Sequence, residues 1–184
     1  MKLKDIEEKI KTVHSPNTKE ERAAFCKYAG KVPDNGTIVD IGTCAGSSAF
    51  IFAFASKPSV KVFTMDPNRS EKFFYDWERL GFLEKLTYYQ QTSEAFAKDF
   101  NGKIDLLFVD GVHSYRGVGN DINWFKKHMV DGGIIMFHDY YLYRNTIGRA
   151  INEAEERGDI EKIEIIDSLY KENVRTGLYI ARVK

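Results

Sequence analysis

The stretch Thr37-Ile-Val-Asp-Ile-Gly-Thr-Cys-Ala-Gly-Ser-Ser48 decides how this chain folds. An apolar segment ends in an acid, turns through Gly42 and Gly46, and runs into a fully apolar segment at 49–55. Proteins of the α/β class build a nucleotide-type pocket in this way, at the carboxyl end of the first strand. We therefore predict a strand at 37–40, a glycine loop and a helix that begins behind it.

Three later motifs strengthen this prediction, because a pair of glycines alone is a weak signal. Each of them places polar groups just after an apolar strand, where doubly wound sheets bind their ligands. They are Met65-Asp-Pro67, Val109-Asp-Gly-Val-His-Ser-Tyr115 and Phe137-His-Asp-Tyr140.

The rest of the chain alternates between segments with strand and helix patterns. Further strands are expected at 60–65, 86–90, 104–110 and 134–137. Two last β segments, at 161–167 and 177–183, have no helix between them and should pair as an antiparallel hairpin. The pattern predicts a single α/β domain over residues 1–184, a Rossmann-like doubly wound sheet that is mostly parallel.

Two helices are expected before the first strand. Leu3, Ile6, Ile10 and Val13 recur at helical spacing, and Thr18-Lys-Glu-Glu21 reads as a capping box that opens a second helix. These first 30 residues form either a lid over the ligand pocket or a dimer contact, since both would bury the apolar stripe.

Composition narrows the partners of this domain. Lys plus Arg and Asp plus Glu are 27 each among 184 residues, so no basic tract predicts binding of nucleic acid. The longest apolar run is too short to span a membrane, and the first residues lack a secretory signal. Cys26 and Cys44 form no disulfide framework, so we expect a cytoplasmic protein.

The glycine loop favours a nucleoside ligand without phosphates. A dinucleotide loop needs a glycine where this chain has Cys44, so that pyrophosphate can approach the backbone. Asp66, twenty residues after Gly46, ends the second strand and can accept hydrogen bonds from both ribose hydroxyls. In the alternative interpretation, the glycines serve only a tight turn and Asp66 caps the turn before Pro67.

Taken in order, these motifs resemble the class I S-adenosylmethionine-dependent methyltransferases over residues 37–183. Within that class, the segments 109–115, 131–133 and 138–140 are similar to small bacterial methyltransferases and to metal-dependent O-methyltransferases of natural-product sugars. The resemblance implies that S-adenosylmethionine is the methyl donor. Asp40 and Gly42, in the loop that ends at Gly46, would line its methionine end, Asp66 would hold the ribose, and Ser93 would lie beside the adenine.

The resemblance also implies a divalent metal, Mg²⁺, Mn²⁺ or a similar ion. Its ligands would be Asp110, after the fourth strand, with His138 and Asp139 after the fifth. The relatives carry two acids where this chain has His138 and Asp139, and an imidazole suits Mn²⁺, Fe²⁺ or Zn²⁺ better than Mg²⁺. His113 is the candidate general base, acting with Asp110; alternatively it caps the next helix or holds Asp110 in place.

We therefore expect an enzyme that methylates an oxygen of a small hydroxylated acceptor with the help of a metal, as a monomer or a homodimer. Two alternatives stay open. The same fold and metal cluster suit a metal-dependent hydrolase or oxygenase-type enzyme, and the donor pocket suits a non-catalytic module that binds S-adenosylmethionine.

Overall fold

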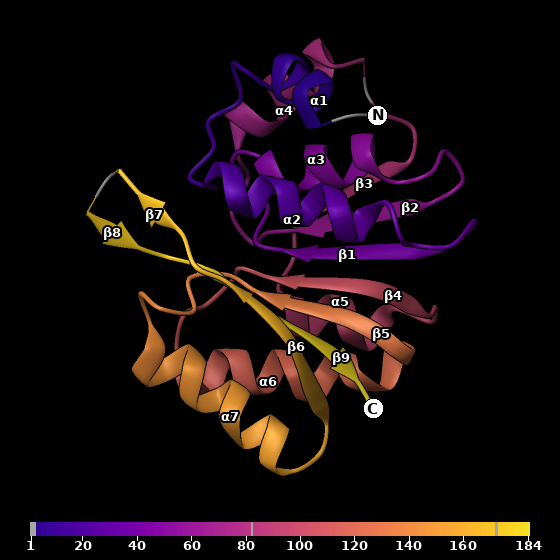
Figure 1. Ribbon diagram of the computed structural model, residues 1–184. Helices are drawn as coiled ribbons and strands as arrows, with labels where there is room; N and C mark the ends of the chain where they lie inside the picture. The colour runs from indigo at the N-terminus through magenta and orange to yellow at the C-terminus, as the bar shows by residue number, and fades with distance from the viewer. Residues whose placement is uncertain (1–2, 82, 172) are drawn as a thin grey trace.

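A mixed seven-stranded sheet forms the centre of the molecule (Figure 1). The computed structural model describes residues 3–81, 83–171 and 173–184. Along the sheet the strands follow the order β3-β2-β1-β4-β5-β9-β6; the first five run parallel, and β9 pairs antiparallel with both β5 and β6. Their bounds are Thr37–Ile41 (β1), Lys61–Met65 (β2), Leu86–Tyr89 (β3), Ile104–Val109 (β4), Met129–Phe137 (β5), Ile160–Ile166 (β6) and Leu178–Val183 (β9). The predicted Rossmann-like fold with its terminal antiparallel pair is confirmed.

Helices cover both faces of this sheet. One face carries α1 (Leu3–Lys9), α2 (Lys19–Ala29), α3 (Ser47–Ala55) and α4 (Glu71–Arg79), and the other carries α5 (Ser93–Asp99), α6 (Tyr115–Phe125) and α7 (Arg149–Glu156). A 3₁₀ turn, Lys126–His128, and a π-helical turn, Arg144–Gly148, precede β5 and α7 respectively.

Alternation along the strands divides the apolar side chains between two cores. Ile38 and Phe108 face the α1–α4 side, whereas Val39 and Val109 face the α5–α7 side. A strand buried on both faces needs apolar residues at nearly every position, which explains the continuous apolar runs of β1 and β4. Burial of apolar surface stabilises the folded state by a free energy on the order of 25 cal/mol per Å².

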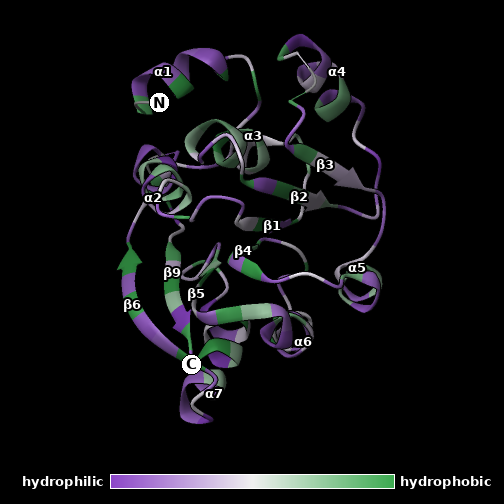
Figure 2. Cartoon of the chain, turned by 90° about the vertical axis from the view of Figure 1, so that its right-hand side faces the viewer, coloured by the Kyte–Doolittle hydropathy of each residue, from purple (hydrophilic) through white to green (hydrophobic). Residues whose placement is uncertain are grey.

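The helix α3 is apolar on all sides because it is buried on all sides. It packs on β1, β2 and β3 beneath it, while α1 and α2 cover its outer surface (Figure 2). Ile6, Ile10 and Val13, from the N-terminal stripe, are buried in this layer of the same chain. The predicted capping box of α2 is present, with the Thr18 hydroxyl accepting from Glu21 N and Glu21 accepting from Thr18 N.

Three parts of the fold differ from the sequence-based expectation. The strand β5 begins at Met129, and a register shift opposite β4 takes up Gly132, whose φ is +74°. The helix α5 begins at Ser93, soon after the end of β3, where no helix was predicted. A second small hairpin, β7 (Leu169–Tyr170) with β8 (Val174–Arg175), projects between β6 and β9. In the ranges that the structure describes, no helix has both the length and the apolar character needed to cross a membrane.

Candidate active site

The carboxyl ends of β1, β4 and β5 meet at one edge of the sheet, on the left in Figure 1. Backbone hydrogen bonds continue past the strand ends, with Asp110 N donating to Ile41 O and His138 N donating to Val109 O. The glycine loop, Asp110 and His138 are therefore held side by side in register.

A cavity of about 550 Å³ opens at this edge. This volume suits a small-molecule ligand. The described residues that line it are Pro16, Ile41, Gly42, Cys44, Met65, Asp66, Pro67, Asn68, Thr92, Ser93, Asp110, Gly111, Val112, His113, His138, Asp139, Leu142, Tyr170, Val174 and Thr176.

Gly42 lines the cavity and is required there by close backbone contact. Its φ is +98°, and a Cβ at this position would lie 2.1 Å from the Asp110 carbonyl oxygen. Gly46 has a φ of +87° and begins α3; a Cβ there would meet the rings of Phe73 and Phe50. Gly46 is not among the lining residues, so in the structure it serves the packing of the loop.

Asp40 lies behind the glycine loop and is not among the lining residues either. Its carboxylate is fully buried and accepts hydrogen bonds from Ser48 Oγ (2.9 Å) and Thr64 Oγ1 (2.6 Å). Burial raises the pKa of Asp40 to about 7, although the two hydroxyl donors act in the opposite direction. This carboxylate thus fixes the end of β1 to α3 and β2.

Asp66 caps a turn, as one of the two sequence-based interpretations expected, and also lines the cavity. Its Oδ1 accepts from Asn68 N (2.9 Å), which caps the turn, and its Oδ2 accepts from Cys44 N (3.1 Å). The residue also lines the cavity, and a carboxylate can accept about four hydrogen bonds, so acceptor positions remain for a ligand.

Ser93 lines the cavity and is held by a residue that sequence reasoning missed. Its hydroxyl donates to Asp121 Oδ1 at 2.6 Å, and Asp121 is 3% exposed. Burial raises the pKa of Asp121 to about 6. The sequence did hold one signal of this contact: Asp121 is an acid next to Ile122 among the buried residues of α6.

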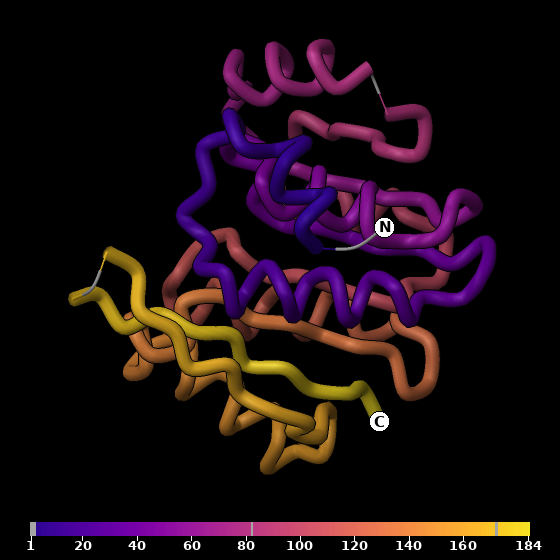
Figure 3. Tube along the Cα trace, turned by 45° about the horizontal axis from the view of Figure 1, so that its top comes forward, coloured from indigo at the N-terminus to yellow at the C-terminus, as the bar shows by residue number. Residues whose placement is uncertain are grey.

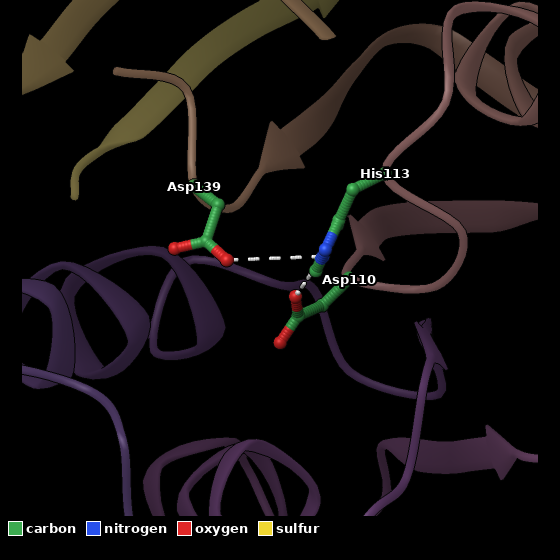
Figure 4. A group of neighbouring side chains, drawn as sticks. All are labelled: Asp110, His113 and Asp139. Carbon is green, nitrogen blue, oxygen red and sulfur yellow. Dashed lines mark hydrogen bonds and ion pairs between the residues drawn. The ribbon is translucent and has the colours of Figure 1, made fainter. Parts of the chain in front are cut away.

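Asp110, His113 and Asp139 gather at the other part of the cavity (Figure 4). One ligand atom from each lies within 4.8 Å of the others. His113 Nε2 is 3.2 Å from Asp110 Oδ1 and 3.8 Å from Asp139 Oδ2. Asp139 adopts a left-handed backbone with a φ of +54°, a conformation that aspartate tolerates better than most residues.

These neighbours shift the proton affinities of the group. The hydrogen bond to Asp110 raises the pKa of His113, and burial acts against it. Burial would raise the pKa of Asp110, but the neighbouring imidazoles of His138 and His113 lower it below its usual value.

His138 lies at the edge of this group and is 3% exposed. Its Nδ1 is 3.4 Å from Asp110 Oδ1 and 3.3 Å from Asp139 Oδ1, yet it has no hydrogen-bond partner. Both His113, in the group within 4.8 Å, and His138, in the sequence-based set, therefore bring a ring nitrogen within 4 Å of Asp110 and Asp139.

Glu21 was also missed as part of the site. It is fully buried, and its Oε2 lies 3.3 Å from His138 Nε2. The capping box predicted its backbone position but not the contact, because Glu21 and His138 are 117 residues apart in the chain.

The helix-cap alternative for His113 is wrong. Ser114 caps α6, with its hydroxyl accepting from Gly117 N. His113 instead contacts Asp110, and its ring stacks on Tyr143 with centroids 4.6 Å apart. Apolar side chains of Val112, Leu142 and Val174 line the cavity on this side.

Comparison with known proteins identifies the family. The sequence pattern of the family described as "Methyltransferase domain" matches residues 39–140, more than half of the chain. A relative, the protein R132 of Acanthamoeba polyphaga mimivirus, is 30% identical over 122 residues. The match takes in 60% of this chain and 54% of R132, so the chain spans about half the length of this curated relative.

Solved structures share the fold. The O-methyltransferase TomG from Streptomyces achromogenes, involved in tomaymycin synthesis and solved with S-adenosylmethionine, superposes with a TM-score of 0.78 at 16% identity. The similarity covers 99% of this chain and 89% of TomG. A SAM-dependent O-methyltransferase from Thermotoga maritima gives a TM-score of 0.74 at 17% identity, with 100% of this chain and 71% of that one covered. From its motifs, its sheet order and the family match, this chain belongs to the methyltransferase domain family and has the Rossmann-like fold of the class I methyltransferases.

Proposed function

We propose that this domain transfers the methyl group of S-adenosylmethionine to an oxygen of a small hydroxylated acceptor, with the assistance of a divalent cation. One observation carries the proposal. A single cavity has the hydrogen-bonding residues Asp66 and Ser93 on one part of its wall and Asp110, His113 and Asp139 on another.

The donor would lie along the glycine loop. Gly42 allows close approach to the backbone, Asp66 offers a carboxylate to the ribose hydroxyls, and Ser93 offers a hydroxyl oxygen to the adenine. Asp40 and Gly46 would not contact the donor; they would hold the glycine loop and the start of α3 in position. No lining residue among those described is a Lys or Arg, as suits a ligand without phosphates.

The group formed by Asp110, His113 and Asp139, together with the neighbouring His138, suits a divalent cation. Two carboxylates and an imidazole lie within reach of one ion, and the buried Nδ1 of His138 lacks a hydrogen-bond partner. Asp110 and Asp139 would hold the ion together with Nδ1 of His138, in a ligand set that Mn²⁺ accepts readily, and His113 would stay free to act as a base. Such an ion would supply Lewis-acid stabilisation of the acceptor oxygen as it loses its proton.

The protein residues would then align and activate the acceptor. His113 Nε2 would take the hydroxyl proton, and the oxygen lone pair would attack the methyl carbon as the carbon–sulfur bond breaks towards sulfur. The products are the methyl ether of the acceptor and S-adenosylhomocysteine. Val112, Leu142 and Val174 favour an acceptor with an apolar body beside its hydroxyl group.

Calorimetric titration of S-adenosylhomocysteine, with and without Mn²⁺, is the first test. We expect the protein to bind S-adenosylhomocysteine and Mn²⁺. Labelled methyl groups should then pass from S-adenosylmethionine to members of a panel of sugars, catechols and other phenols, and this transfer should depend on Mn²⁺. Absence of donor binding would contradict the proposal, and metal-dependent hydrolysis or oxidation without a donor would favour the hydrolase or oxygenase alternative. Donor binding without transfer to any acceptor would favour the non-catalytic module.

A further inference from the structure

A carboxylate outside the cavity contacts the histidine at its edge. Glu21 belongs to the first turn of α2 and touches His138 at the end of β5. We propose that Glu21 is a positioning residue: it holds the Nε2–H of His138, so that Nδ1 faces Asp110 and Asp139 as a ligand for the divalent cation. This inference rests on the proposed metal assistance.

Four groups fix the orientation of the Glu21 carboxylate. Its Oε2 accepts from Thr18 N (2.8 Å) and faces His138, and its Oε1 accepts from Ser168 Oγ (2.7 Å) and Thr176 Oγ1 (2.9 Å). A backbone N–H and two hydroxyl groups donate to its two oxygens, as suits a carboxylate that accepts at both of them. A buried carboxylate with all its partners in place has one favourable orientation.

The same carboxylate ties together three distant parts of the chain. Ser168 and Thr176 flank the β7–β8 hairpin, and the start of α2 lies against the base of that hairpin (Figure 3). Tyr170 and Val174, from the hairpin, line the cavity. Glu21 therefore joins the hairpin that covers the cavity to the histidine at its edge.

The charge of Glu21 decides which ring nitrogen of His138 carries a proton. A bare Nε2 lone pair 3.3 Å from a carboxylate oxygen would be repelled, whereas an Nε2–H is attracted. The amide of Asn17 also lies 3.3 Å from Nε2. The Asn17 atom nearest Nε2 in the structure is Nδ2, and an Nε2–H requires the amide to be turned by 180° so that its oxygen accepts, a change that leaves the shape of the group nearly the same.

The other ring nitrogen of His138, Nδ1, faces Asp110 and Asp139. Nδ1 has no hydrogen-bond partner and lies between Asp110 Oδ1 and Asp139 Oδ1. A cation bound among these three atoms would neutralise the negative charge of both carboxylates and bind to Nδ1. In metal sites, a carboxylate that accepts from the far nitrogen of a ligating histidine fixes the ring and increases its basicity.

Titration of Mn²⁺ into Glu21→Gln, beside the wild type, tests the role of the carboxylate. We expect Mn²⁺ affinity to fall about 10- to 100-fold, as is usual when such an outer partner is removed. The affinity for S-adenosylhomocysteine should not change. Asp76→Asn is the matched control, since Asp76 is another carboxylate with 1% side-chain exposure, paired with Lys72 and Arg79 in α4 and away from the cavity.

A double-mutant cycle distinguishes positioning from general stabilisation. His138→Gln should lower Mn²⁺ affinity, and Glu21→Gln should add no further loss in that background because Glu21 acts through the ring. A full additional loss in the double variant would overturn the inference, as would equal loss of S-adenosylhomocysteine affinity in Glu21→Gln.

A spectrum of the wild-type protein covers the case in which Glu21→Gln does not fold. Long-range ¹⁵N–¹H correlation with and without Zn²⁺ should show His138 Nδ1 changing on ion binding while Nε2 stays protonated. An unchanged Nδ1 signal would overturn the inference. Wild-type protein that binds S-adenosylhomocysteine but no Mn²⁺ would overturn metal assistance and this inference together, whereas unchanged Mn²⁺ affinity in Glu21→Gln would overturn this inference alone.

Discussion

The Nε2 atom of His113 lies 3.2 Å from Asp110 Oδ1 and 3.8 Å from Asp139 Oδ2, and the residue lines the cavity. As the general base, it must lose its proton before it can accept one from the acceptor. Because Asp110 raises the pKa of His113, kcat/KM should fall as the pH decreases through that raised value.

Substitution of this residue should separate chemistry from donor binding. In His113→Asn we expect kcat to fall about 10²- to 10⁴-fold and the acidic limb of the pH profile to disappear, with S-adenosylhomocysteine affinity unchanged. His128→Asn is the control, since His128 lies beside Ala97 O on the α5–α7 side and is not among the lining residues. Undiminished turnover in His113→Asn would remove His113 from the mechanism.

The buried Asp40 should make stability depend on pH. Its pKa is about 7 in the folded protein, against an ordinary value of 3.8 for an aspartate in water, so the folded state binds the extra proton between these values. Stability contributed by the protonated group is therefore lost as the pH rises from about 4 to about 7, in total by about 4 kcal/mol.

Chemical denaturation of wild type and Asp40→Asn across this pH range measures the effect. The asparagine cannot ionise, so the wild-type unfolding free energy should decrease relative to that of the variant as the pH rises. A difference between the two proteins that stays constant with pH would show that Asp40 is not protonated in the fold.

At the scale of one element, the turn from β1 into α3 depends on how closely the end of β4 approaches it. In Gly42→Ala the new Cβ would meet the Asp110 carbonyl oxygen in addition to the strain of a positive φ. Gly132→Ala is the matched control, because its φ is +74° but nothing lies within 4 Å of a Cβ there. We expect the control to lose about 1–2 kcal/mol of unfolding free energy and Gly42→Ala clearly more, by thermal or urea unfolding. Equal losses would mean that the loop can move away from Asp110.

The strands and most helices could be predicted because their patterns are local. The apolar runs of β1 and β4 and the spacing of Val118, Ile122 and Phe125 in α6 each lie within one short segment. The β7–β8 hairpin escaped prediction because its two-residue strands have no periodicity, and α5 because its seven residues make only about two helical turns.

The candidate site was predictable where a residue lies within a few positions after the end of a strand. Asp66, Asp110 and Asp139 were found in this way, and all three line the cavity. Glu21 and Asp121 were not, since each lies within a helix and meets its partner only through tertiary packing. Sequence spacing also could not show that the side chain of Asp40 turns away from the cavity, to Ser48 and Thr64.

At the scale of the whole molecule, the cavity joins the part proposed for the donor and the part proposed for the metal, which different strands supply. Asp66 follows β2, whereas Asp110 and Asp139 follow β4 and β5. The proposed division predicts that a substitution in one part can weaken its ligand without weakening the ligand of the other part.

Thermal unfolding with S-adenosylhomocysteine at 100 times its Kd tests this division. Binding at that excess stabilises the folded state by about 2.7 kcal/mol, which raises the Tm of a domain of this size by about 5–11 °C. In Asp139→Asn the increase should be retained, because the substitution removes a metal ligand far from the ribose. In Asp66→Ala, measured at the same ligand concentration, it should shrink to about half or less, because a tenfold weaker Kd leaves only about 1.4 kcal/mol. Loss of the increase in both variants would mean that the donor spans the two parts, and Asp139 would then belong to the donor site.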